Sequence, residues 1–257
     1  MDRRELLRFL AAAGMCGAQG APRAAPPEVL AKPIPSSGER LPVVGLGTWL
    51  TFDVGDDAVA RHARGEILKA FFAAGGRLVD SSPMYGTSEE VVGAEAARLE
   101  RQALFAATKV WTIGALAGRR QIEHSRELWR LPRLDLLQVH NLLDWETQLA
   151  TLQAMKAAGQ VRYIGVTTSH GRRHDVVARI LRRERLDFVQ LSYSLADRAG
   201  EALLDLAAER GVALIANRPF DGGALFYRVR GRELPAIAAE ADCQSWAEVF
   251  LKFIVSH

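Results

Sequence analysis

The feature that most constrains the fold is a regular alternation of short apolar runs with amphipathic stretches, which begins near Leu41. In the amphipathic stretches apolar residues recur at spacings of three and four, as Ile67, Leu68, Phe71 and Phe72 do, and this spacing predicts helices. The apolar runs between them are candidate strands. Seven such runs occupy residues 43–47, 77–81, 104–110, 134–141, 161–169, 186–194 and 212–220.

Strict alternation of strand and helix implies a parallel sheet with right-handed crossovers. Two α/β architectures satisfy this pattern: an open doubly wound sheet and a closed (β/α)8 barrel. The open sheet usually carries a glycine-rich phosphate loop after its first strand. Gly45-Leu46-Gly47 lacks the third glycine, and Thr48-Trp49 is a poor helix start. The sequence therefore favours a (β/α)8 TIM barrel that stops after about seven β/α units.

Residues 1–27 differ in composition from residues 28–257, which form the predicted barrel. Arg3 and Arg4 precede a short, mildly apolar run and then small residues, a pattern that resembles a twin-arginine export signal. The segment is too short and too rich in Gly and Ala to serve as a membrane anchor. It predicts recognition by export machinery and a periplasmic or otherwise exported protein; the alternative is a disordered basic tail.

Composition argues against several other partners and ligands. Only 7% of the residues are aromatic, and they do not interleave with basic residues as in a nucleic-acid surface. The net charge of +3 is weak evidence for an acidic partner, since several arginines lie in the leader. His170 and His174 are four residues apart, but the arginines beside them disfavour a cation, so no metal is expected. The arginines from 172 to 185 fit the solvated face of a helix, with an anion site as the alternative.

Ionisable residues stand where three successive candidate strands end. Asp80, Lys109 and His140 each come at or near the end of an apolar run, and Tyr85 follows Asp80 in the turn at residues 81–86. Any one of them would ordinarily be a helix cap or a rim residue. In a barrel, however, the carboxyl ends of the strands meet at one face, where active sites are built. The recurrence therefore predicts a catalytic site.

The chemistry of this set suits proton delivery to an oxygen that gains negative charge. A tyrosine phenol has a pKa of about 10, too high for an efficient donor near neutral pH. A nearby lysine would stabilise the phenolate and lower that value, and a carboxylate would keep the lysine charged. Lys109 and Asp80 are the candidates for these roles beside Tyr85. His140 would orient the substrate oxygen.

From about Gly38 onward the chain resembles the aldo-keto reductases, because six stretches of sequence occur in the same order as in that family. They are "LPVVGLGTW", residues 79–86 (which end in "SPMYG"), "ATKVW", "LLQVHN", "YIGVTT" and "LDFVQLSYS". The resemblance implies an NADP(H)-dependent oxidoreductase that reduces an aldehyde or ketone, a small-molecule carbonyl substrate, to an alcohol. It implies that Tyr85 is the general acid. It also implies that Thr48, Trp49 and Trp111 line the nicotinamide and substrate pocket, that Asp80 lies beside the cofactor, and that Gln190 binds the nicotinamide carboxamide.

Two stretches depart from the family pattern. Thr167 and Thr168 stand where the family commonly has Ser-Asn holding the carboxamide, so Thr167 can keep the hydroxyl contact while Thr168 offers a hydroxyl in place of an amide. Asn217, Arg218 and Phe220 stand where the family often has Tyr-Ser-Pro-Leu, whose tyrosine stacks on the nicotinamide. Phe220 is a candidate replacement ring. Arg218 is either a pyrophosphate ligand or a solvent-facing charge.

The sequence stops before the eighth strand and the phosphate-gripping loop of the family. We expect an incomplete reading frame rather than a loss of function, because the four catalytic candidates are all present. Weak NADPH preference is expected for the 257-residue chain. The rival interpretation is a non-catalytic barrel of the same fold that binds a nucleotide or a partner.

Overall fold

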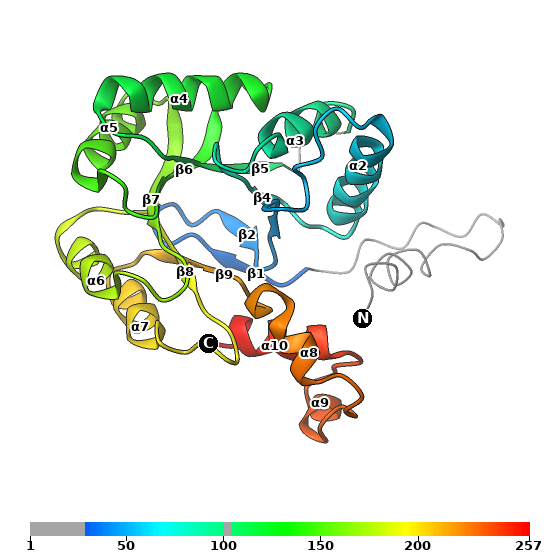
Figure 1. Ribbon diagram of the computed structural model, residues 1–257. Helices are drawn as coiled ribbons and strands as arrows, with labels where there is room; N and C mark the ends of the chain where they lie inside the picture. The colour runs from blue at the N-terminus through cyan, green and yellow to red at the C-terminus, as the bar shows by residue number, and fades with distance from the viewer. Residues whose placement is uncertain (1–28, 100–103) are drawn as a thin grey trace.

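The computed structural model describes residues 29–99 and 104–257, drawn in colour in Figure 1. The predicted leader at residues 1–27 lies outside the described residues. The chain forms a seven-stranded parallel sheet with helices outside it and a separate two-stranded hairpin. In Figure 1 the strands form an inner arc, and the hairpin lies within it.

The seven predicted strands are all present and pair in sequence order. They are β3 (Leu46–Gly47), β4 (Leu78–Asp80), β5 (Phe105–Val110), β6 (Leu134–His140), β7 (Val161–Thr167), β8 (Phe188–Ser192) and β9 (Ala213–Asn217). Every neighbouring pair is parallel. The sheet curls into a nearly closed barrel, in which β3 and β9 are the two edge strands. This confirms the predicted α/β barrel class.

Helices connect the strands on the outside of the sheet, as the crossover rule requires. They are α2 (Ala58–Ala73), α3 (Ser88–Ala96), α4 (Ala115–Leu128), α5 (Trp145–Ala157), α6 (His174–Arg183) and α7 (Glu201–Glu209). The start of α2 shows why a helix begins there: the Asp57 carboxylate accepts hydrogen bonds from the backbone N–H groups of Val59 and Ala60. Helix α4 begins at Ala115, directly after Gly114.

An antiparallel hairpin that the strand pattern did not predict closes the amino-terminal end of the barrel. It consists of β1 (Ala31–Pro33) and β2 (Arg40–Pro42). Ile34 and Leu41 from the hairpin pack against barrel-interior side chains, among them Phe105 and Tyr163, in one apolar cluster. The hairpin thus closes the end of the barrel opposite the carboxyl ends of the strands.

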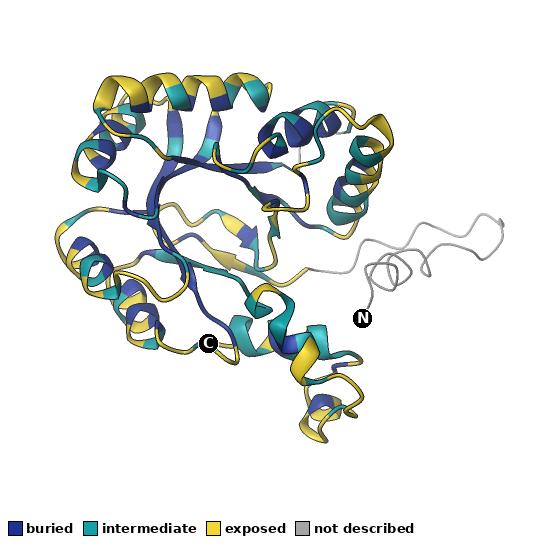
Figure 2. Ribbon diagram, viewed as in Figure 1, coloured by how far each residue is buried: buried dark blue, intermediate teal, exposed yellow. Residues whose placement is uncertain are grey.

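A second and larger apolar cluster lies between the outside of the sheet and the helices. It includes Val79, Ala106 and Leu137 from the strands, with Leu68 and Ile122 from the helices. Figure 2 shows the central strands as almost continuously buried, whereas β9 is only half-buried, as expected of an edge strand. Two-sided burial explains why the central strands read as largely apolar runs in the sequence.

After β9 the chain forms a small helical subassembly. It comprises η2 (Asp221–Gly223), α8 (Ala224–Arg228), α9 (Ile237–Glu240) and α10 (Trp246–Val255). Ser245 and Glu248 form a capping box at the start of α10. Phe250 of α10 packs against Phe226 of α8, with ring centroids 5.6 Å apart. Within the described residues, no helix is both long and apolar enough to cross a bilayer.

Candidate active site

The parallel register brings the predicted catalytic residues to one level of the barrel. Asp80 and His140 are the last residues of β4 and β6, and Lys109 is the penultimate residue of β5. Lys109 is in register with Gln138, two residues before His140. Tyr85 lies in the turn between β4 and α3 and contacts the His140 ring edge-on at a centroid separation of 5.8 Å. The structure therefore brings together Asp80, Tyr85, Lys109 and His140.

Lys109 and Asp80 form a buried ion pair at the centre of this cluster. Lys109 Nζ donates to Asp80 Oδ2 at 2.7 Å and to the Ser81 carbonyl oxygen at 2.5 Å. Gln138 Nε2 donates to the other Asp80 oxygen at 3.4 Å. The Lys109 side chain is 1% exposed and that of Asp80 is 14% exposed. A buried charge of this kind requires a partner, and Asp80 is that partner.

The turn that carries Tyr85 is fixed by Asp53. The Asp53 carboxylate accepts hydrogen bonds from the backbone N–H and the hydroxyl of Thr87, at 2.9 and 3.0 Å. Gly86 has a φ of +57°, and a Cβ at this position would meet the Asp53 carboxylate at 2.3 Å. Both constraints require glycine after Tyr85. As a result the phenol is held beside Lys109, whose Nζ lies 5.1 Å from the centroid of the Tyr85 ring.

The pKa of Tyr85 does not move in the expected direction. Burial raises the pKa of the phenol above its usual value, and the negative charge of Asp80 raises it further. The sequence pattern predicts instead that Lys109 lowers this pKa. The structure shows that Lys109 is already engaged by Asp80, so desolvation of the phenolate prevails. Tyr85 is therefore fully protonated at neutral pH, which is the state that a proton donor needs.

His140 is buried and neutral. Burial lowers its pKa to about 3, and the positive charge of Lys109 acts in the same direction. Its Nδ1 lies 2.8 Å from the hydroxyl oxygen of Ser82. A neutral imidazole has one donor and one acceptor nitrogen, so a ring held in this way can offer a single hydrogen bond to a substrate oxygen.

The predicted carboxamide ligands form a second row across β7, β8 and β9. The Thr167 hydroxyl donates to Gln190 Oε1 at 2.9 Å, and these residues are in register. Asn217 Nδ2 donates to the Thr168 carbonyl oxygen at 2.9 Å. The hydroxyl of Thr168 is buried and has no hydrogen-bond partner among the described residues. A buried polar atom without a partner is uncommon in proteins, so this hydroxyl is a candidate hydrogen-bonding group for a bound molecule.

The three pocket residues expected near the first strands differ in exposure. Trp49 and Trp111 are exposed, and both follow strand carboxyl ends closely in the sequence. Thr48 is fully buried, and its hydroxyl donates to Ser81 Oγ at 2.9 Å and to the Asp80 carbonyl oxygen at 3.1 Å. Thr48 thus joins the end of β3 to the end of β4, so its hydroxyl is already used within the protein.

Arg218 and Phe220 lie beyond the end of β9. Arg218 is half-buried with a φ of +56°, and its guanidinium is 3.5 Å from the Asp221 carboxylate. The Phe220 ring lies 5.0 Å from the Phe226 ring, between centroids, and so contributes to the helical subassembly. Their predicted roles toward the cofactor stay predictions.

Sequence reasoning missed three residues that support the catalytic set: Ser81, Ser82 and Gln138. Ser81 supplies a carbonyl to Lys109, Ser82 contacts His140, and Gln138 contacts Asp80. The two serines were visible in the sequence as a pair of hydroxyls directly after Asp80. Their partners come from other strands, however, and only the sheet register could have identified them.

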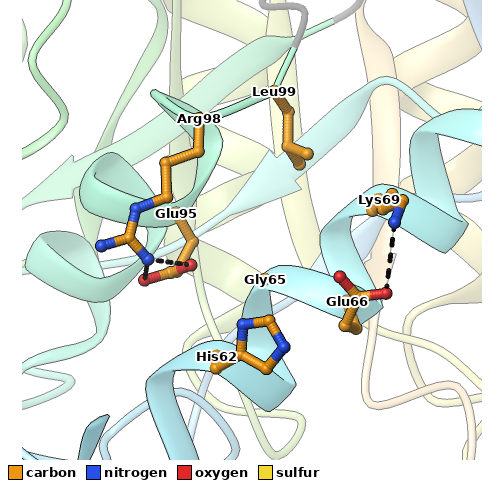
Figure 3. A pocket seen from close by; sticks show the side chains of 7 residues that line it. All are labelled: His62, Gly65, Glu66, Lys69, Glu95, Arg98 and Leu99. Atoms are coloured by element: carbon orange, nitrogen blue, oxygen red, sulfur yellow. Dashed lines mark hydrogen bonds and ion pairs between the residues drawn. The ribbon is translucent and has the colours of Figure 1, made fainter.

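A recess between α2 and α3, of about 360 Å³, lies away from these strand ends. Figure 3 shows its lining, in which Arg98 pairs with Glu95 and Lys69 pairs with Glu66. Gly65 lies where the two helices meet, and a Cβ there would displace the Glu95 carboxylate, whose Oε2 would be 2.6 Å away. The charges of the recess are paired with one another, and none of the predicted catalytic residues lines it. Among the described residues no cluster of three or more His, Cys, Asp or Glu could hold a metal ion.

Comparisons with known proteins agree with this geometry. Residues 43–257 match the model of the aldo/keto reductase family. A search of curated proteins finds no match.

Solved structures similar to this chain include an aldo-keto reductase from Bombyx mori in complex with NADP, with 22% identity and a TM-score of 0.69 over 89% of this chain and 80% of that one. Another, from Klebsiella pneumoniae in complex with NADP and acetate, has 26% identity and a TM-score of 0.62 over 76% and 69% of the two chains. A third, the holo form of a Bacillus halodurans enzyme, has 22% identity and a TM-score of 0.64 over 81% and 71%. On the family match and the strand-end site together, this chain belongs to the aldo/keto reductase family.

Proposed function

We propose that this protein is an NADP(H)-dependent carbonyl reductase that converts an aldehyde or ketone to an alcohol, with Tyr85 as the general acid. Membership of the family supports a carbonyl oxidoreductase in general. The observation that carries the finer proposal is the contact set of Lys109, whose Nζ lies 2.7 Å from the Asp80 carboxylate and 5.1 Å from the centroid of the Tyr85 ring.

The strand ends have the chemistry to hold a nicotinamide. Its carboxamide needs both donors and acceptors, and the row of Thr167, Thr168, Gln190 and Asn217 supplies hydroxyl and amide groups. The unpartnered Thr168 hydroxyl is the strongest single sign, because ligand binding would satisfy it. Arg218 is the candidate cation for the pyrophosphate. Bound NADPH would supply the hydride for the carbonyl carbon.

The residues of this chain would supply the proton and position the carbonyl. Negative charge develops on the carbonyl oxygen as the carbon is reduced, and the Tyr85 hydroxyl gives its proton to that oxygen. Lys109 stabilises the phenolate left behind, and Asp80 holds Lys109 in place. His140, neutral and buried, orients the same oxygen through a hydrogen bond. Trp49 and Trp111 are exposed near this end and are the candidate walls of the substrate pocket.

A steady-state assay with a reactive aldehyde and NADPH tests the proposal. Replacing the donor in Tyr85→Phe should lower turnover by about 10²- to 10⁴-fold, the usual contribution of a general acid. NADPH binding, followed by fluorescence, should change little. Tyr227→Phe is the matched control, since Tyr227 is 71% exposed on α8. Equal rates for Tyr85→Phe and the control would reject Tyr85 as the donor.

We also propose export through Arg3 and Arg4, which rests on the sequence of the leader alone. Replacing both arginines with lysine should leave the protein in the cytoplasm, as measured by cell fractionation and immunoblotting. Unchanged delivery to the periplasm would reject the twin-arginine interpretation.

A further inference from the structure

We propose that Ser82 is a positioning residue that selects the tautomer of His140, so that Nε2 carries the proton and faces the substrate oxygen. The proposal rests on the proposed function for its catalytic consequence, but the tautomer itself can be measured independently. It starts from one contact: Ser82 Oγ lies 2.8 Å from His140 Nδ1, and both side chains are buried.

The hydrogen-bond inventory of Ser82 decides the direction of this bond. Among the described residues, Ser82 Oγ has two hydrogen-bond neighbours, His140 Nδ1 and the backbone N–H of Met84, at 3.4 Å. The Met84 N–H can only donate, so the serine oxygen accepts there. The serine proton then has one acceptor within reach, Nδ1. If Nδ1 were protonated instead, the Ser82 hydroxyl proton would be buried without an acceptor, which is costly.

The charge state of the ring makes this choice consequential. His140 is neutral near physiological pH, because burial and then Lys109 disfavour the imidazolium. A neutral ring carries one proton, so an acceptor Nδ1 requires a donor Nε2. No hydrogen bond joins Nε2 to any of the described residues. The nitrogen that carries the proton is thus also the one left for a substrate oxygen.

The same contact also fixes the orientation of the ring. Ser82 belongs to the turn that carries Tyr85, and the Tyr85 N–H donates to the Ser82 carbonyl oxygen at 3.0 Å. One short turn therefore places the proton donor and sets the partner that orients the carbonyl. The two proposed contacts to the substrate oxygen are thus linked by a segment of only four residues, from Ser82 to Tyr85.

Long-range 1H–15N NMR of the full chain tests the tautomer directly, because protonated and unprotonated ring nitrogens have well-separated 15N shifts. His140→Asn assigns the His140 signals by their disappearance. The wild-type protein should show His140 with a proton on Nε2, and Ser82→Ala should give a mixture of tautomers. A wild-type ring protonated on Nδ1 would overturn the proposal, whether or not the protein reduces carbonyls.

Kinetics supply the second measurement. Loss of one ordinary hydrogen bond should lower kcat for an aldehyde by roughly 3- to 10-fold in Ser82→Ala, with NADPH affinity unchanged. Ser82→Thr keeps a hydroxyl and should restore the Nε2–H signal. Ser37→Ala is the matched control, because Ser37 Oγ is also 2.8 Å from a polar atom on a ring, Tyr163 Oη, at the opposite end of the barrel. Wild-type tautomer and rate in Ser82→Ala would reject the role of Ser82.

Discussion

The two ends of the barrel are both built around charged networks, but they use their charges differently. At the amino-terminal end, Glu39 accepts hydrogen bonds from Tyr163, Arg162 and Arg77. At the carboxyl end, Lys109 and Asp80 form the central pair. Both networks join segments far apart in the sequence, so each contributes to holding the barrel together.

The difference lies in which polar atoms remain free. At the carboxyl end the buried Thr168 Oγ1 and Gln138 Oε1 have no partner among the described residues, whereas no such atom belongs to the network around Glu39. Buried polar groups are normally satisfied. The network around Glu39 therefore serves to hold the hairpin in place, whereas the carboxyl end keeps polar atoms that the proposed cofactor could satisfy.

Burial also separates the two ends. The Lys109 side chain is 1% exposed, whereas those of Arg162 and Glu39 are 30% and 22% exposed. Breaking a buried pair leaves an uncompensated charge in the protein interior, but a partly exposed pair can exchange its partner for water. Variants at the two ends should reveal this contrast.

The largest effect is expected for Lys109→Met. It leaves Asp80 without its cation, so the free energy of unfolding should fall by about 3–5 kcal/mol, as measured by urea denaturation. Lys69→Met is the control, since Lys69 forms an exposed pair with Glu66 and should change stability by less than about 1 kcal/mol. Similar losses in the two variants would show that the carboxyl-end pair is not special.

A double-mutant kinetic cycle tests whether Lys109 and Tyr85 act on the same proton. Lys109→Met should also lower turnover severely, because the developing phenolate of Tyr85 loses its stabilising charge. The double variant with Tyr85→Phe should be little slower than the slower single variant, since both changes act on one proton. Rate losses that multiply across the cycle would mean that the two residues act independently.

The sequence predicted the strands and the four catalytic candidates because both depend on local patterns. Apolar runs predict strands, and the residues that follow parallel strands meet at one face. The hairpin was missed because β1 and β2 are only three residues each. Ser82 was missed as a partner because its contact, His140, lies 58 residues away in the sequence. Thr48 was expected in the pocket, but its hydroxyl points to Ser81, a detail that no pattern specifies.

A smaller effect, confined to stability, is expected at the amino-terminal end. Glu39→Gln should lower the free energy of unfolding by about 1–2 kcal/mol, with turnover unchanged. A hydrogen bond to a charged group contributes about 1.5–3 kcal/mol, and partial exposure of the pair reduces this. Burial alone would raise the pKa of Glu39, but the hydrogen bond from Tyr163 and the contacts with Arg162 and Arg77 outweigh it and lower the pKa. A carboxyl with a lowered native pKa stabilises the fold above its unfolded pKa.

The lowered pKa of Glu39 predicts how its contribution to stability depends on pH. The stabilisation should be lost as pH falls below the ordinary carboxyl pKa of 4.5, so the wild type and Glu39→Gln should converge in stability in acid. Urea denaturation at neutral and acid pH measures the difference. A gap that persists at low pH, or a fall in turnover at neutral pH, would contradict a purely structural role for the hairpin network.

The smallest expected effect is on the pH dependence of the rate. The pKa of His140 is lowered to about 3, so its ring stays neutral across the range from about pH 5 to 8 in which an ordinary histidine titrates. The pKa of Tyr85 is raised, so its phenol stays protonated there as well. Neither group should therefore produce an inflection in a plot of kcat/KM against pH over that range. The contrary result would be an inflection near the ordinary histidine pKa of 6.5 that disappears in His140→Gln. It would show that His140 gains a proton in the working enzyme. The carboxyl end would then tolerate a second cation beside Lys109.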